Sequence, residues 1–183
     1  HVHLDVMDGK FTPNKSIDLE HLWLPDTMTC DLHVMFQDPE RAIDELRKLS
    51  VRTVIVPAEA DVDFSQLANK LHDRQIQFGV ALLAETTVES AREAIRQADH
   101  VLIFSGNLGY QGGSKADLSL LAKIPKVKAI NSRIEFGWDG GLNLETIKQI
   151  SDAGVTVFNS GGFVQFAANP ADAYAKLVHA VKD

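Results

Sequence analysis

Short apolar segments alternate with amphipathic segments along the whole chain, and this alternation limits the possible folds more than any other feature. Seven apolar or β-branched segments are predicted as strands, at residues 2–7, 29–36, 52–56, 76–83, 100–104, 133–138 and 155–159. Helices are predicted between and after them, at residues 16–24, 38–49, 64–74, 87–97, 116–122, 143–153 and 170–181. Because consecutive parallel strands need a helical crossover, this order indicates a parallel sheet.

The predicted fold class is α/β, a TIM (β/α)8 barrel of which this chain carries about seven βα units. The strand segments are mostly apolar on both faces, as expected where helices cover one side and a barrel interior the other. A TIM barrel closes with eight units. The chain begins at His1, inside a strand-like segment, so we treat residues 1–183 as one barrel domain without its N-terminal βα unit. An open doubly wound sheet is the alternative, but no Gly-x-Gly-x-x-Gly follows the first strand.

The charge balance argues against a nucleic-acid partner, because the net charge is −7 and no basic stripe is present to neutralise phosphates. No apolar run approaches membrane-spanning length, so we expect no membrane partner either. A small anionic ligand remains possible, since backbone amides can hold a phosphate. Cys30 is the only cysteine, which excludes an internal disulfide and fits a cytoplasmic location. We interpret it as a buried apolar residue rather than a nucleophile.

Polar residues stand out at the ends of otherwise apolar strands. His3 and Asp5 share one face of the first strand, His33 lies near the end of the second, and Asp139 follows the sixth. In a TIM barrel the functional residues sit at the C-terminal ends of the strands. Taken singly, each residue is more often a core histidine or a turn aspartate. Together, two imidazoles and two carboxylates indicate a site for a divalent first-row metal.

Three segments resemble the ribulose-phosphate 3-epimerase family. Residues 3–14, His-Leu-Asp-Val-Met-Asp-Gly-Lys-Phe-Thr-Pro-Asn, resemble its signature His-x-Asp-Val-Met-Asp-Gly-x-Phe-x-Pro-Asn. Residues 31–35, Asp-Leu-His-Val-Met, with Pro39 and Glu40, resemble its second histidine motif. Residues 136–141, Phe-Gly-Trp-Asp-Gly-Gly, resemble its Val-Asp-Gly-Gly segment. The resemblance runs over nearly the whole chain, and the first motif is long enough to be highly specific.

The resemblance implies a metal-dependent isomerase of carbohydrate metabolism that epimerises a ketose phosphate at C3, interconverting D-ribulose 5-phosphate and D-xylulose 5-phosphate. It implies one divalent ion, Fe2+, Zn2+, Mn2+ or Co2+. The implied ligands are His3, Asp5, His33 and Asp139. Asp5 and Asp139 match the acid–base pair of the family, and Met7 and Met35 match residues that wall the pocket. We expect a small-molecule sugar phosphate as the partner and a homo-oligomer as the assembly.

Glycine-rich segments after the last strands are candidates for phosphate binding. TIM barrels often hold a phosphate on the loops after the seventh and eighth strands, and glycines let the backbone amides approach the anion. The loop at residues 107–113 also resembles the Asn-Pro-Gly-Phe-Gly-Gly-Gln lid of the family. The predicted phosphate-end residues are Gly112, Gly113, Gly140, Gly141, Ser160 and Gly161.

Other segments depart from the family pattern. Residues 56–60 read Val-Pro-Ala-Glu-Ala where the family has His-x-Glu-Ala, and residues 81–84 read Ala-Leu-Leu-Ala where it has Ala-Leu-Asn-Pro. Contacts to the phosphate end and the pocket wall therefore differ. A 3-epimerase for a related ketose phosphate, such as allulose 6-phosphate, is one alternative, and a non-catalytic sugar-phosphate-binding homologue is another. A related decarboxylase is disfavoured, because its Asp-x-Lys-x-x-Asp motif lacks its lysine here.

Overall fold

The computed structural model describes residues 1–45, 49–110 and 112–182. Seven parallel strands form one sheet in the order β1-β2-β3-β4-β5-β6-β7. Their bounds are β1 Val2–Met7, β2 Cys30–Met35, β3 Val51–Pro57, β4 Gln77–Leu82, β5 His100–Phe104, β6 Glu135–Asp139 and β7 Val157–Asn159. This sequential order confirms the barrel prediction and excludes the doubly wound alternative.

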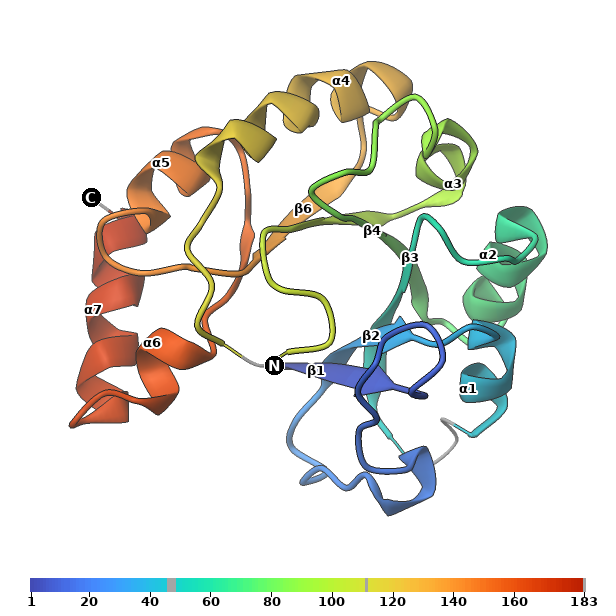
Figure 1. Cartoon of the computed structure of the whole chain (residues 1–183), viewed down its shortest axis with the longest axis horizontal. Coiled ribbons are helices and arrows are strands. Elements are labelled where there is room, and N and C mark those ends of the chain that lie inside the picture. The colour runs from blue at the N-terminus through green and yellow to red at the C-terminus, as the bar shows by residue number, and fades with distance from the viewer. Residues whose placement is uncertain (46–48, 111, 183) are drawn as a thin grey trace.

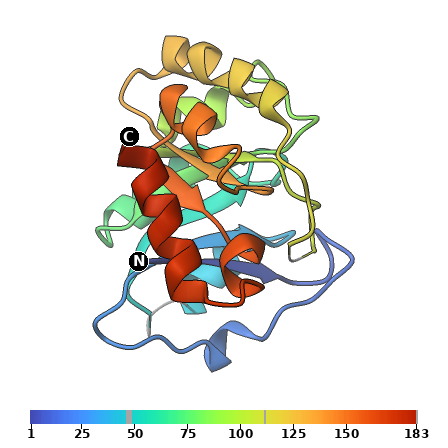
Figure 2. The ribbon, with the colours of Figure 1, turned by 90° about the vertical axis from the view of Figure 1, so that its left-hand side faces the viewer.

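Helices cover the outside of the curved sheet (Figure 1). They are α1 Pro39–Glu45, α2 Phe64–His72, α3 Arg92–Gln97, α4 Lys123–Ile130, α5 Ile147–Asp152, α6 Gly162–Gln165 and α7 Pro170–Lys182, with the 3-10 helices η1 Leu19–His21 and η3 Leu118–Ala122. Figure 2 shows α7 lying along this outer surface, where it contacts α5 and α6. None of these helices in the described ranges is long and apolar enough to cross a membrane.

Several predicted helices begin or end elsewhere. The helix predicted over residues 16–24 is only the 3-10 turn η1, and that over residues 116–122 is the 3-10 helix η3. α4, which follows η3, was missed because Pro125 reads as a helix breaker, although proline is tolerated in a first turn. The predicted helix over residues 38–49 runs into the segment 46–48, which lies outside the described residues.

Two other predicted helices lose their first turns to side-chain capping. The side chain of Asn143 accepts hydrogen bonds from the backbone amides of Glu145 and Thr146, so α5 starts only at Ile147. In the same way the hydroxyl of Thr87 accepts from the amide of Ser90, ahead of α3. Short polar side chains compete with helical hydrogen bonds in this way.

The main hydrophobic core lies between the sheet and the helices, and the barrel interior holds a much smaller one. Because side chains alternate along a strand, Leu32 and Val34 of β2 pack outward against the helices. Inside the barrel, the buried apolar cluster consists of Ile55, Ala81 and Leu102. The interior is therefore left largely to polar groups at its two ends.

One polar group closes the end of the barrel where the strands begin. A register shift in β3 opposite Cys30 and Asp31 places Arg52 at a bulge. Its guanidinium binds both oxygens of Asp31 (Nε–Oδ1 2.7 Å, Nη2–Oδ2 2.6 Å). Nη1 of Arg52 lies 2.9 Å from Oε2 of Glu135, which also lies 2.9 Å from Nδ1 of His100. We call Asp31, Arg52, His100 and Glu135 the floor network.

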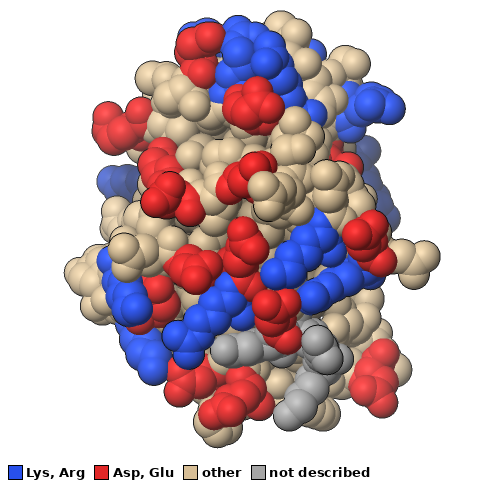
Figure 3. Space-filling view, turned by 90° about the vertical axis from the view of Figure 1, so that its right-hand side faces the viewer, with Lys and Arg blue, Asp and Glu red and all other residues tan. Residues whose placement is uncertain are grey.

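On the outer face formed by α1 and α2, basic and acidic side chains alternate (Figure 3). Arg74 lies 3.1 Å from Asp44, while Lys70 lies 3.4 Å from Asp44 and 3.6 Å from Glu40. Exposed pairs of this kind contribute little to stability. The positive charges on this face are therefore matched by nearby negative ones.

Candidate metal centre and active site

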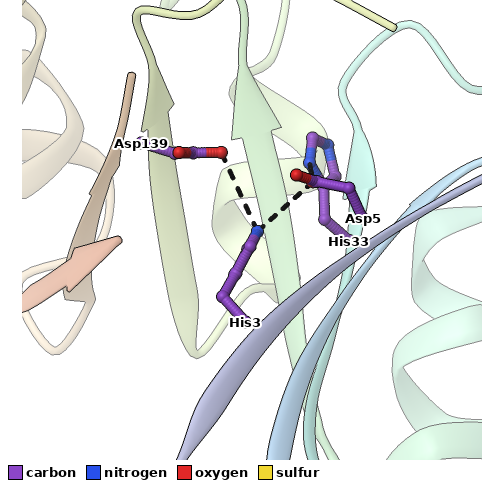
Figure 4. A group of neighbouring side chains, drawn as sticks. All are labelled: His3, Asp5, His33 and Asp139. Carbon is purple, nitrogen blue, oxygen red and sulfur yellow. Dashed lines mark hydrogen bonds and ion pairs between the residues drawn. The ribbon is translucent and has the colours of Figure 1, made fainter. Parts of the chain in front are cut away.

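Two histidines and two aspartates converge inside the barrel mouth (Figure 4). Nδ1 of His33 lies 3.0 Å from Oδ1 of Asp5. Nε2 of His3 lies 3.4 Å from the same Asp5 oxygen and 3.9 Å from Oδ2 of Asp139. One ligand atom from each of the four residues can be chosen so that all lie within 4.8 Å of one another.

The strand geometry explains this convergence. His3 and Asp5 lie two residues apart on β1, so their side chains point to the same face. Asp5 pairs with His33 in the parallel register of β1 and β2. Asp139, the last residue of β6, reaches the group because the sheet curls and brings β6 opposite β1.

The buried imidazoles leave nitrogen atoms without partners. His33 is fully buried and the side chain of His3 is 9% exposed. Nε2 of each ring is buried and has no hydrogen-bond partner. Such unsatisfied atoms are uncommon in folded proteins and call for an explanation, such as an ion. A set of two imidazole nitrogens and two carboxylates suits a divalent first-row metal, so these residues fit the implied ion.

The local charges push the two carboxylates apart in acidity. Partial burial by itself raises the pKa of Asp5, but hydrogen bonds with His3 and His33 outweigh this effect and hold its pKa well below the ordinary value. Burial and the negative charge of Asp5 raise the pKa of Asp139. Burial lowers the pKa of His3, yet contact with Asp5 and the nearby negative charges raise it overall. Environments that separate two carboxyl pKa values in this way are typical of acid–base pairs.

Two further residues contact the centre and were missed at the level of sequence. The ring of Phe104, at the end of β5, lies edge-on to His33 with 5.6 Å between ring centroids. Nδ2 of Asn159, at the end of β7, lies 3.1 Å from Nδ1 of His3. The signal that pointed to Asp139, a polar residue closing an apolar strand, is also present at Asn159. Of the predicted wall residues, Met35 is buried and Met7 partly buried.

The predicted glycine loops meet at the same rim. A Cβ atom on Gly140 would overlap the backbone at Ser105 and Gly106, so the loops after β5 and β6 pack backbone to backbone. The hydroxyl of Ser160 donates to the carbonyl of Leu142 at 3.4 Å and links the loops after β6 and β7.

The remaining predicted glycines differ in how tightly they are packed. Gly141 is covered by Lys115 and Ala116 of the lid, whereas Gly113 and Gly161 have free space where a Cβ would be. Gly112 packs near Gly162 of α6. Gln111, part of the lid motif, lies outside the described residues.

The family model described as "Ribulose-phosphate 3 epimerase family" matches residues 1–165. The chain belongs to the ribulose-phosphate 3-epimerase family. This confirms the resemblance seen in the motifs and the expected enzyme class, an isomerase. Membership supports pentose-phosphate epimerisation in general.

Relatives named ribulose-phosphate 3-epimerase match along most of the chain. The protein of Schizosaccharomyces pombe is 27% identical over 186 positions, covering 98% of this chain and 81% of the relative. That of Encephalitozoon cuniculi is 34% identical over 164 positions, covering 88% and 74%. That of Bacillus subtilis is 30% identical over 171 positions, covering 89% and 78%.

Solved structures agree on the fold of this ribulose-phosphate 3-epimerase family member. A 3-hexulose-6-phosphate synthase superposes with a TM-score of 0.61 at 26% identity, covering 82% of this chain and 73% of the synthase. KGPDC from Streptococcus mutans, solved in complex with a sugar phosphate, gives a TM-score of 0.66 at 15% identity, covering 85% and 73%. These similarities confirm the TIM-barrel fold.

Proposed function

We propose that this protein is a metal-dependent 3-epimerase that interconverts D-ribulose 5-phosphate and D-xylulose 5-phosphate, with Asp5 and Asp139 as its acid and base. The observation that carries the proposal is the convergence of two buried imidazoles with unpartnered Nε2 atoms and two carboxylates in the barrel mouth. Family membership supplies the general reaction, and the geometry of the four side chains supports the mechanism.

The chemistry explains why these residue types are needed. Epimerisation at C3 of a 2-ketose removes a proton from one face of the carbon and returns one to the other face, through an enediolate. Asp5 and Asp139 project from β1 and β6, on different sides of the barrel mouth, so one carboxylate can take the proton while the other delivers its replacement. A divalent Fe, Zn, Mn or Co ion held by His3, Asp5, His33 and Asp139 would stabilise negative charge as a Lewis acid.

A direct assay tests the proposal. The protein should epimerise ribulose 5-phosphate, and a chelator should abolish the reaction until metal is restored. The same assay on allulose 6-phosphate distinguishes the six-carbon alternative. Metal binding without turnover of either sugar would favour the non-catalytic homologue, and full activity in chelated, metal-free protein would refute metal dependence.

His33→Ala should weaken metal binding by about 100-fold or more, because it removes one ligand of four and even outer-sphere partners of ligands are worth about 10–100-fold. The measurement is Zn2+ affinity in competition with a chromogenic chelator, with circular dichroism to verify folding. His72→Ala is the matched control, since His72 pairs with Asp99 on the surface at 2.7 Å, away from the centre. Unchanged Zn2+ affinity in His33→Ala would exclude His33 as a ligand.

For the phosphate end, we propose the loops that carry Gly140, Gly141, Ser160 and Gly161, with lid residues Gly112 and Gly113 closing over them. Gly161 offers the sharpest test. A Cβ atom there would meet nothing within 4 Å, and its φ of −75° is open to any residue. Gly161→Val should therefore fold normally yet hinder an anion at the backbone. We expect KM to rise about tenfold, the value of one weakened hydrogen bond to a charged group, with an unchanged melting temperature.

A neighbouring pocket supplies the competing outcome. It has a volume of about 350 Å³, adjoins Met7 and is lined by three cationic side chains, Lys10, Lys15 and Arg41. If Lys10→Gln raises KM and Gly161→Val does not, the phosphate lies in this pocket rather than on the glycine loops. Under our proposal Lys10→Gln leaves KM unchanged.

A further inference from the structure

A side-chain hydrogen bond connects the two edge strands of the sheet. β1 and β7 stand at opposite ends of the strand order and are not paired with each other in the described sheet. Nδ2 of Asn159, the last residue of β7, nevertheless lies 3.1 Å from Nδ1 of His3 on β1. The contact therefore joins the strand edge of β7 to one of the four clustered residues.

This contact sets the orientation of the His3 ring. With Nδ1 held by Asn159, Nε2 faces Asp5 at 3.4 Å and Asp139 at 3.9 Å. His33 is held differently, through Asp5 and the edge-on ring of Phe104. His3 is thus the imidazole of the centre whose second nitrogen meets a neutral amide.

The direction of the hydrogen bond defines which nitrogen of His3 carries the proton. An amide NH2 group can only donate, so when Nδ2 of Asn159 faces Nδ1, that nitrogen keeps its lone pair and the proton of the neutral ring is on Nε2. A nitrogen that ligates a cation must offer its lone pair. Ligation through Nε2 therefore requires the proton to move to Nδ1, and this Nδ1–H then needs an acceptor.

We propose that Asn159 is a positioning residue for His3, whose amide turns by half a rotation to present Oδ1 to Nδ1–H when a cation binds at Nε2. The amide oxygen and nitrogen occupy equivalent positions about the last side-chain bond, so the turn replaces a donor by an acceptor without moving either strand. Partners of this kind orient ligating histidines and raise their basicity. The inference rests on the proposed metal centre and adds to it a residue from β7.

The test compares two variants of similar size. Asn159→Leu removes both donor and acceptor, and Asn159→Asp keeps only an acceptor. We expect Asn159→Leu to bind Zn2+ about 10–100-fold more weakly, the usual cost of losing such a partner. Asn159→Asp should bind as tightly as the wild type or more tightly. The visible spectrum of the Co2+-loaded protein should change in Asn159→Leu and be restored in Asn159→Asp.

Controls separate this role from simple support of the edge strands. Thr156→Val, just before β7, should leave Zn2+ affinity unchanged, and melting temperatures of the metal-free proteins report any loss of stability. Equal Zn2+ affinity of Asn159→Leu and wild type overturns the inference alone. Weak binding by Asn159→Asp also overturns it, because an acceptor would then be insufficient. Absence of Zn2+ binding by the wild type overturns it together with the metal centre.

Discussion

Asp5→Asn or Asp139→Asn should lower kcat by about two to four orders of magnitude, the usual value of a positioned general acid or base. Asparagine keeps the size and one oxygen of aspartate but cannot accept the C3 proton. KM should change much less, because the lost interaction matters mainly in the transition state. Steady-state kinetics on both epimers measure the effect. Asp61→Asn, at an exposed position outside the cluster, is the matched control.

Proton exchange at C3 in deuterated water separates the roles of the two aspartates. With one carboxylate disabled, abstraction from one epimer should survive as exchange without inversion. The other variant should show the mirror pattern with the opposite epimer. If both variants interconvert the epimers at near wild-type rates, the two-base scheme fails and the cluster has a structural role.

Arg52→Met should reduce the free energy of unfolding by about 3 kcal/mol, the lower end of the cost of removing one partner from a buried ion pair. The lower end applies because Arg52 is 27% exposed, whereas its partner Asp31 is 1% exposed and would be left as a buried, unpaired carboxylate. Denaturant unfolding measures the change. Arg92→Met is the matched control, since Arg92 makes the same two-bond contact with Glu89 (2.8 and 2.7 Å) on the surface. Its effect should be much smaller.

The pH dependence of the Arg52→Met effect provides a second check. Hydrogen bonding with His100, assisted by Arg52, lowers the pKa of Glu135 despite its partial burial. A carboxyl with a depressed folded-state pKa stabilises the fold above its unfolded pKa, about 4.3 for Glu, and loses this contribution as the pH falls through the folded-state pKa. The gap between wild type and Arg52→Met should therefore narrow in acid. In the double variant Asp31→Leu/Arg52→Met, most of the lost stability should return. An Arg52→Met loss no larger than that of Arg92→Met would contradict the role of the floor network.

The strand pattern was predictable because alternation and apolar runs depend on local sequence. The placement of His3 and Asp5 on one face follows from the two-residue period of β1. Helix starts were less predictable, since side-chain caps such as that of Asn143 delay the first helical turn. Contacts that depend on curvature could not be predicted: nothing local tells that Asn159 reaches His3, 156 residues away in sequence. The bulge that turns Arg52 toward Asp31 likewise depends on pairing register.

The division of each strand into an inward and an outward face has a consequence for how this protein can change over time. On β2, His33 belongs to the cluster and its neighbours Leu32 and Val34 belong to the helix-facing core. Mutations that alter ligand choice and mutations that alter robustness thus fall on alternate positions of the same strand. Each kind can accumulate without drawing on the other, so a new specificity can be acquired on the inner face while the outer face preserves the scaffold.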